Sequence, residues 1–286
     1  MAQAPEELNN RLDNISAIQP LLAALRTISL SNWRVALRKI TRALSYLSRF
    51  QLILEEISKL LPEGSQTIDL GGKKSHIIIV VGSNRGLCGD FNRDLADQVL
   101  QYKRNPEISP KIILFGERLK KIIDRKKIAY DGYFSFPNPS EITPKYAKDI
   151  LLQINSDSQE SEKSLIFNMY RGAGKYTTTF SPIYPNLFIK DTAKGKSLEG
   201  FTFDTPPADI LAFVKNELSH LSLYYAFLLS SAAEHSTRFQ LMENAATNAD
   251  NLSDELFLEV QALRRQRITE EMQELAIGAG LLRKQR

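Results

Sequence analysis

Two long stretches of the sequence carry apolar side chains at alternating steps of three and four residues. The first, Glu6–Leu61, contains one proline, Pro20, and no glycine, and the second, Ala208–Ile277, contains neither residue. Helix interiors exclude both, because glycine raises the entropic cost of ordering and proline removes a backbone donor and clashes with the preceding turn. Two long helices are therefore predicted, the first bent or loosened at Pro20.

The apolar spacing averages 3.5 residues, which keeps one seam of a helix facing a partner helix in a left-handed supercoil. The first seam comprises Leu8, Leu12, Ile15, Gln19, Leu22, Trp33, Leu37, Ile40, Leu44, Leu47, Gln51, Leu54, Ile57 and Leu61. The second comprises Leu211, Val214, Leu218, Leu221, Tyr225, Leu228, Ala232, His235, Phe239, Met242, Ala246, Ala249, Ser253, Leu256, Val260 and Leu263. The second helix would be roughly 105 Å long, too long for a compact domain of this mass. An antiparallel coiled-coil shaft is predicted.

The segment between the two stretches alternates strand and helix patterns. Buried strands are predicted at His76–Gly82, Lys111–Gly116 and Ser164–Tyr170, and helices at Asp94–Lys103, Glu117–Lys127 and Tyr146–Ile154. Such alternation is typical of a parallel α/β sheet, here a Rossmann-like domain. The predicted organisation is a helix in residues 1–72, an α/β domain in residues 73–200 and a helix in residues 201–286.

Composition narrows the class of protein. The 286 residues are 43% hydrophobic and 24% charged, which excludes a disordered chain. A single cysteine, Cys88, excludes an internal disulfide, and the three histidines lack metal-ligand spacing. The longest apolar run, Ile77–Val81, is too short to span a membrane, and the acidic start is not a signal peptide. We expect a soluble, intracellular type of protein without cofactor or metal.

Two glycine-rich segments are candidate binding loops. Gly82–Gly89 follows a predicted buried strand, the place where phosphates bind in many α/β folds, but it matches no phosphate-loop motif. The favoured interpretation is a structural turn in which glycines such as Gly86 and Gly89 adopt positive φ. Cys88 has no neighbouring histidine, so a small buried role is favoured over a nucleophile. Arg171–Lys175 lacks the Walker spacing and is interpreted as a flexible basic loop.

Charge is unevenly distributed along the first helix. Every charged residue between Asn14 and Leu54 is basic, namely Arg26, Arg34, Arg38, Lys39, Arg42 and Arg49. This face is either simply solvated or contacts an acidic protein surface. Nucleic acid is disfavoured because no aromatic side chains are interleaved and the net charge is only +4. His235, on the second seam, is interpreted as a register-setting or satisfied buried polar group.

Two segments resemble the gamma subunit of F-type rotary ATP synthases. Asn84–Gly89, followed by Phe91 and Asn92, is similar to the Asp-Arg-Gly-Leu-Cys-Gly turn after that family's first central strand. Met242–Leu252, with Arg264–Leu275 and the glycines at 278 and 280, looks like the family's C-terminal signature. The resemblance is strong over residues 77–92 and 231–282 and rests elsewhere on layout and length.

The resemblance implies a non-catalytic rotor shaft that couples ion flow through a membrane ring to ATP synthesis or hydrolysis on a surrounding hexamer of alpha and beta subunits. It also implies contact with the epsilon subunit and the c-ring, and a peripheral location on the cytoplasmic face of a bacterial plasma or thylakoid membrane. The positions implicated in shaft packing or hexamer contact are Leu25, Arg238, Arg264, Thr269, Glu271 and Glu274. Phe203 and Asp204 fall near the membrane-ring contact, and the basic stretch would face acidic loops of the beta subunits.

The N-terminal segment departs from the family pattern. Where the family has a sequence similar to Thr-Gln-Lys-Ile-Thr-Lys-Ala-Met, residues 18–25 lack both lysines and both threonines and add Pro20. These changes indicate a divergent member of the family. Its complex could be the main ATP synthase or an alternative one, and the transported ion could be the proton or sodium. Two other functions remain open: a helical scaffold or regulatory paralogue, and a nucleotide-binding α/β enzyme.

Overall fold

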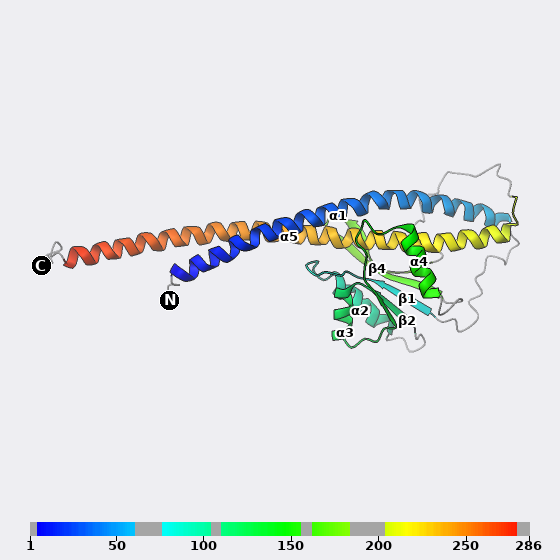
Figure 1. Cartoon of the computed structure of the whole chain (residues 1–286), viewed down its shortest axis with the longest axis horizontal. Coiled ribbons are helices and arrows are strands. Elements are labelled where there is room, and N and C mark those ends of the chain that lie inside the picture. Colours follow the sequence, from blue (N-terminus) through cyan, green and yellow to red (C-terminus); the bar gives the residue numbers. More distant parts are fainter. Residues whose placement is uncertain (1–4, 61–75, 104–109, 156–161, 184–203, 279–286) are drawn as a thin grey trace. The chain divides into compact units, whose positions relative to one another are not determined.

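The computed structural model describes residues 5–60, 76–103, 110–155, 162–183 and 204–278. The elements, in chain order, are α1 (Pro5–Leu60), β1 (His76–Val81), α2 (Phe91–Lys103), β2 (Lys111–Phe115), α3 (Glu117–Arg125), β3 (Gly132–Phe134), α4 (Pro144–Asn155), β4 (Glu162–Gly172), β5 (Lys175–Pro182) and α5 (Pro207–Gly278) (Figure 1). The chain divides into two units, residues 1–27 with 240–286, and residues 28–239. Each unit therefore contains part of α1 and part of α5.

Both long helices are present, and their bounds agree closely with the sequence pattern. α1 has 56 residues with Pro20 inside it, and α5 has 72 residues. Every predicted seam position that the structure describes is buried or half-buried, from Leu8 in α1 to Leu263 in α5. Within the described residues, no helix combines the length and the apolar character that crossing a bilayer requires.

The two helices run antiparallel within each unit. In the first unit, Leu8 packs with Leu256 and Val260, the Gln19 amide donates a 2.7 Å hydrogen bond to Asp250, and Arg26 pairs with Glu243 at 3.0 Å. The partner's number falls as the position in α1 rises. In the second unit, the rings of Trp33 and Phe239 lie 5.9 Å apart between centroids.

The sheet of the second unit is mixed, with the strand order β3-β2-β1-β4-β5. β1, β2 and β4 are parallel, as predicted; β3, which was not predicted, is also parallel, and β5 pairs antiparallel with β4. The prediction of a flexible loop at Arg171–Lys175 is wrong, because these residues close a β4–β5 hairpin. Gly172 and Gly174 have φ of 144° and 65°, values that glycine adopts without steric cost.

Helices cover both faces of this sheet. One face, with Ile78, Val80 and Leu114, packs against α2 and α3. The other face shares a core with side chains of α4, α1 and α5, and Phe227 of α5 lies against Phe115 of β2 with ring centroids 5.0 Å apart. Burial on both faces explains why β1 is an uninterrupted apolar run rather than an alternating one.

Candidate functional site

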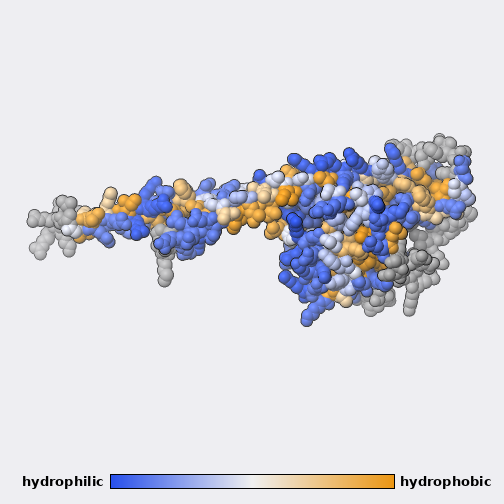
Figure 2. All heavy atoms as spheres, viewed as in Figure 1, coloured by the Kyte–Doolittle hydropathy of each residue, from blue (hydrophilic) through white to orange (hydrophobic). Residues whose placement is uncertain are grey.

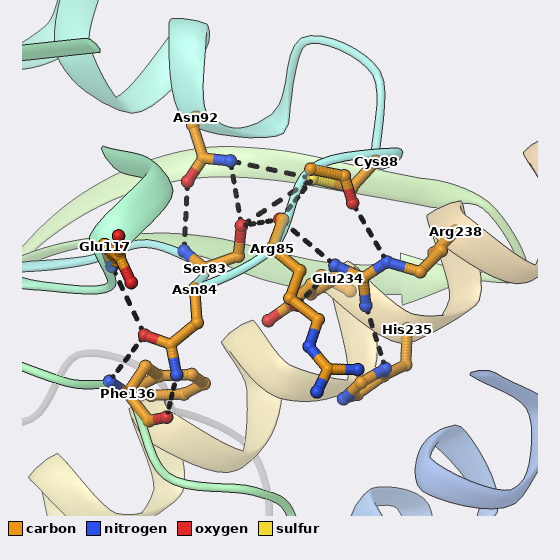
Figure 3. A network of polar contacts seen from close by, with 12 residues as sticks. Ser83, Asn84, Arg85, Cys88, Asn92, Glu117, Phe136, Glu234, His235 and Arg238 are labelled. Carbon is orange, nitrogen blue, oxygen red and sulfur yellow. Dashed lines mark hydrogen bonds and ion pairs between the residues drawn. The ribbon is translucent and has the colours of Figure 1, made fainter. Parts of the chain in front are cut away.

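The turn after β1 lies where the sheet, α3 and α5 come together (Figure 3). Gly82 opens it, and a Cβ there would lie 2.5 Å from the Leu119 Cβ and 2.9 Å from the Asn92 side-chain oxygen. Gly116, which ends β2 with φ of 101°, approaches the Ser83 backbone so closely that a Cβ would lie 2.6 Å from its carbonyl oxygen. Two glycines are thus required by close approach at the base of the turn.

The residues with positive φ in the turn agree only in part with those expected from the sequence. Gly89 has φ of 61°, as expected of a turn glycine, but the other left-handed residue is Leu87 with φ of 60°, not Gly86. A Cβ on Gly86 would meet only ordinary contacts, at 3.7 Å from the Arg118 Nε. The expectation for Gly86 is therefore wrong, because its neighbour adopts the conformation that reverses the chain.

Buried polar groups cross-link the turn to α2. The Ser83 amide donates to the Asn92 side-chain oxygen at 3.0 Å, and the Asn92 amide donates to the Ser83 hydroxyl at 2.9 Å. That hydroxyl donates to the Arg85 carbonyl at 2.7 Å. Cys88 is 1% exposed, and burial first, then the charge of Glu234, raises the pKa of its thiol. A raised pKa favours the protonated thiol, which suits a small buried side chain better than a nucleophile.

Asn84 connects the turn to the ends of β2 and β3. Its side-chain oxygen accepts hydrogen bonds from the backbone amides of Phe136 at 3.0 Å and Glu117 at 3.2 Å. Its amide donates to the Phe136 carbonyl. The side chain thus satisfies an amide in the first turn of α3 and both backbone groups of Phe136, which fixes the position of the turn on the sheet.

Arg238 of α5 reaches the same turn from the other side. Its guanidinium donates to the Gly86 carbonyl at 3.1 Å and the Arg85 carbonyl at 3.3 Å, and it pairs with Glu234 at 2.6 Å. It also lies 3.2 Å from the His235 Nδ1. Both side chains of the Arg238–Glu234 pair are only 7% exposed. Burial lowers the pKa of His235, so a neutral imidazole accepts this hydrogen bond.

The polar groups of the turn therefore form hydrogen bonds with other groups of the protein itself. Two of its carbonyls accept from Arg238, and its serine and asparagine side chains bind other parts of the fold. The described residues contain no group of three or more histidine, cysteine, aspartate or glutamate side chains placed to hold a metal ion. The arrangement is that of a structural junction.

The other predicted site residues make none of the contacts described for this junction. Leu25 is half-buried on α1, and the others on α5 are exposed: Arg264, Thr269, Glu271 and Glu274. Glu271 accepts a 3.2 Å hydrogen bond from the Arg267 Nε, and Thr269 donates to the Arg265 carbonyl at 2.8 Å. Asp204 is exposed just before α5, and Phe203 lies outside the described residues.

Three polar residues at the junction were missed from the sequence: Glu234, Asn84 and Asn92. Glu234 had a usable signal, because Glu and Arg four residues apart on one helix are placed to pair. Glu234 is also adjacent to the predicted seam position His235, and Arg238 lies three residues after it. The two asparagines had none, since their partners are backbone groups of Phe136, Glu117 and Ser83, distant in sequence.

Comparison with known proteins extends over nearly the whole chain. A family model described as "ATP synthase" matches residues 5–282. A mitochondrial ATP synthase F(1) complex subunit gamma from Rattus norvegicus is 28% identical, over 97% of this chain and 98% of the relative. An ATP synthase gamma chain from Fusobacterium nucleatum is 26% identical, over 97% of this chain and 99% of the relative.

Solved structures of similar fold are also ATP synthase components. A chain of the Euglena gracilis mitochondrial ATP synthase, in a structure described as OSCP/F1/c-ring, has a TM-score of 0.64 at 16% identity, covering 99% of this chain and 98% of that one. A chain of the Tetrahymena thermophila central stalk and c-ring structure has a TM-score of 0.59 at 18% identity, covering 79% of this chain and 99% of that one. The chain belongs to the ATP synthase family, as a gamma chain, the non-catalytic rotor subunit of the central stalk.

Proposed function

We propose that α1 and α5 form an antiparallel coiled-coil shaft that couples ion flow through a membrane ring to ATP synthesis or hydrolysis on surrounding alpha and beta subunits. The observation that carries the proposal is the pairing of the helices in opposite directions along continuous seams. Gln19 with Asp250 and Arg26 with Glu243 are seven residues apart on both helices, a shared register. Two helices packed along one seam resist bending more than one helix does, as the transmission of torque requires.

Part of α1 offers a basic face to a partner. Arg34, Arg38, Arg42 and Arg49 are all exposed and, at about 100° per residue, fall within about 80° of one another around the helix. No acidic side chain lies between Asn14 and Leu54 to neutralise them. This face complements acidic loops, and we assign it to contacts with the beta subunits.

The end of α5 offers an apolar face in addition to charged groups. Phe257, Leu258, Ile268, Met272, Leu275 and Ile277 are each more than half exposed, and apolar side chains are visible along this part of α5 in Figure 2. Exposed apolar patches of this kind mark interaction surfaces. We assign this end, with Arg264, Thr269, Glu271 and Glu274, and also Leu25 of α1, to contacts with the alpha–beta hexamer. Arg238, which is buried, serves packing within the chain.

The remaining partners follow from the kinship with central-stalk proteins. The Euglena structure is described as containing F1 and the c-ring, and the Tetrahymena structure as containing the central stalk and the c-ring. We assign residues 1–72 and 201–286 to the shaft and residues 73–200 to the domain that meets the epsilon subunit and the c-ring, with Asp204 near the ring. The chain then works as a peripheral subunit on the cytoplasmic face of a bacterial energy-transducing membrane, without contact with nucleic acid.

Reconstitution tests this function. The chain is mixed with alpha and beta subunits, and we expect a hexamer to assemble around it and ATP hydrolysis to increase. The matched control omits the chain. Failure of the hexamer to form around it would reject the shaft and favour a helical scaffold or regulatory paralogue.

A further inference from the structure

Among the residues that the structure describes, α1 and α5 each contribute a cation that binds backbone carbonyls of the sheet-containing body of the second unit. On α5 the cation is Arg238, which binds the Gly86 and Arg85 carbonyls of the turn after β1 and is itself oriented by Glu234. Figure 3 shows the guanidinium between the turn and the α5 side chains of Glu234 and His235. Loss of either partner of this ion pair would leave an unpaired buried charge, because both side chains are almost fully removed from water.

On α1 the cation is Lys39. Its ammonium donates to three carbonyls of the segment before α4, those of Pro139 at 2.7 Å, Ser140 at 2.8 Å and Ile142 at 2.8 Å. An ammonium has three donors, so this contact uses all of them. Burial lowers the pKa of Lys39, and no carboxylate is among the groups that it binds.

The remaining contact between the helices and the body is mainly apolar. Two further polar contacts involve α5: the Ser230 hydroxyl donates a 3.2 Å hydrogen bond to the Val81 carbonyl, and Glu217 lies 3.8 Å from the Lys148 ammonium of α4. Phe227 of α5 packs on Phe115 and Phe136, and Leu47 of α1 lies in the same core. Apolar contact is non-directional and depends on the area buried, so it resists separation better than it resists sliding. Charge-assisted hydrogen bonds to fixed carbonyls are directional, and a small displacement breaks them.

We propose that Arg238, oriented by Glu234, and Lys39 are positioning residues that lock the shaft helices to the α/β body, so that torque passes between them without slippage. The inference rests on the proposed rotor function and adds to it the residues that carry the mechanical load inside the subunit. It assigns a function to the glycine-rich turn, whose carbonyls form one of the two attachment points. It also explains why an arginine, with its fork of donors, stands at position 238.

The test uses the whole complex in vesicles, assembled from alpha, beta, epsilon, the membrane ring and this chain, and measures ions pumped per ATP hydrolysed. Three variants are compared: Lys39→Met, Arg238→Lys, and the double variant Glu234→Gln with Arg238→Met. The double variant removes both charges at once, which avoids a buried carboxylate without a partner. We expect the pumping ratio to fall about twofold or more in Lys39→Met and the double variant, and less in Arg238→Lys, while ATP hydrolysis continues.

The control is Lys126→Met, which removes the ion pair between Lys126, directly after α3, and Asp97 of α2 without touching α1 or α5. Its pumping ratio should equal that of the unaltered chain. The thermal unfolding midpoint of each variant is also measured and should lie above the assay temperature, so that a lower pumping ratio reflects slippage and not unfolding. A purely structural role of these residues would lower the midpoint without changing the number of ions pumped per ATP. Normal pumping ratios in Lys39→Met and the double variant would overturn the inference alone. A complex that does not pump even with the unaltered chain would overturn the proposed function, and the inference with it.

Discussion

Two glycines of the turn after β1 show that the surroundings of a glycine decide whether a larger residue can replace it. Gly82 and Gly86 are four residues apart in one turn, and both belong to the segment that resembles the family. A Cβ on Gly82 would clash with Leu119, whereas a Cβ on Gly86 has ordinary room. The same substitution should therefore destabilise the protein at Gly82 and have little effect at Gly86.

Gly82→Ala should destabilise the protein by about 1–3 kcal/mol, because the new methyl group overpacks the contact with α3. Gly86→Ala is the matched control and should change the free energy of unfolding by less than about 0.5 kcal/mol. Denaturant unfolding followed by circular dichroism measures both. A larger loss for Gly86→Ala than for Gly82→Ala would show that the contact with α3 does not control this turn.

Acid should destabilise the junction through His235. Burial, with smaller effects from Arg238 and Arg85, lowers the pKa of this histidine below 6.5 in the folded state, although Glu234 opposes the shift. As the pH falls below about 6.5, the histidine is protonated in the unfolded chain before it is protonated in the folded chain. The free energy of unfolding therefore decreases with pH, by at most about 1.4 kcal/mol per pH unit.

The measurement is the free energy of unfolding between pH 7.5 and 5.5, which are chosen as about one unit on either side of the ordinary histidine pKa. His235→Gln should flatten part of the loss seen in the unaltered chain, since the carboxylates titrate equally in both proteins. Parallel curves for the two proteins would mean that His235 does not titrate differently on folding.

At the scale of elements, α5 is a single helix whose parts have different surroundings. Near its start and middle it lies in the core of the second unit, whereas Leu256 and Val260 contact only α1 among the described core residues. A break near Leu256 should therefore affect the first unit and leave the sheet intact.

Leu256→Pro should break α5 there, at a local cost of about 3 kcal/mol or more, because proline removes a donor and clashes with the preceding turn. Helical circular dichroism should fall while the α/β body remains folded, and ATP-driven ion pumping in the assembled complex should couple poorly. Leu256→Ala is the control, since it removes the packing contact but keeps the helix. Unchanged pumping by Leu256→Pro would count against the shaft.

The sequence predicted the elements well where one periodicity held over many residues. The spacing of apolar side chains was sufficient to predict the seams of α1 and α5. The uninterrupted apolar runs were sufficient to predict β1 and β2. β3 and β5 were missed because three residues carry no periodicity and because Lys175–Pro182, with Thr177, Thr178 and Thr179, does not alternate in hydrophobicity. The junction around Arg238 escaped prediction because its acceptors are backbone carbonyls about 150 positions away.

At the scale of the whole molecule, net charge is small but unevenly placed. The chain carries 37 basic and 33 acidic residues, yet the four exposed arginines of α1 lie in a stretch, Asn14 to Leu54, whose sequence contains no acidic residue. Attraction between exposed charges is screened by salt within about 10 Å at 0.1 M. Assembly through this face should therefore depend on ionic strength.

Replacing Arg34, Arg38, Arg42 and Arg49 by glutamine should slow assembly with the alpha and beta subunits by about tenfold or more at low salt, and should weaken its salt dependence. The control replaces four basic residues of the sheet-containing body by glutamine: Arg93, Lys121, Arg125 and Lys127. Both variants lower the net charge from +4 by the same amount. Light scattering during assembly measures the rate, and equal slowing in both variants would reject the α1 face as the docking surface.

The pairing of α1 with α5 has a consequence for synthesis on the ribosome. Gln19 and Asp250 are 231 positions apart, whereas all five strands come from residues 76–182. The sheet has its strands available early, but Gln19 in the seam of α1 has no partner until Asp250 is made 231 residues later, roughly 10–50 s at 5–20 residues per second. During that interval an apolar stripe is exposed on the nascent polypeptide, so α1 is the segment that a ribosome-bound chaperone should protect.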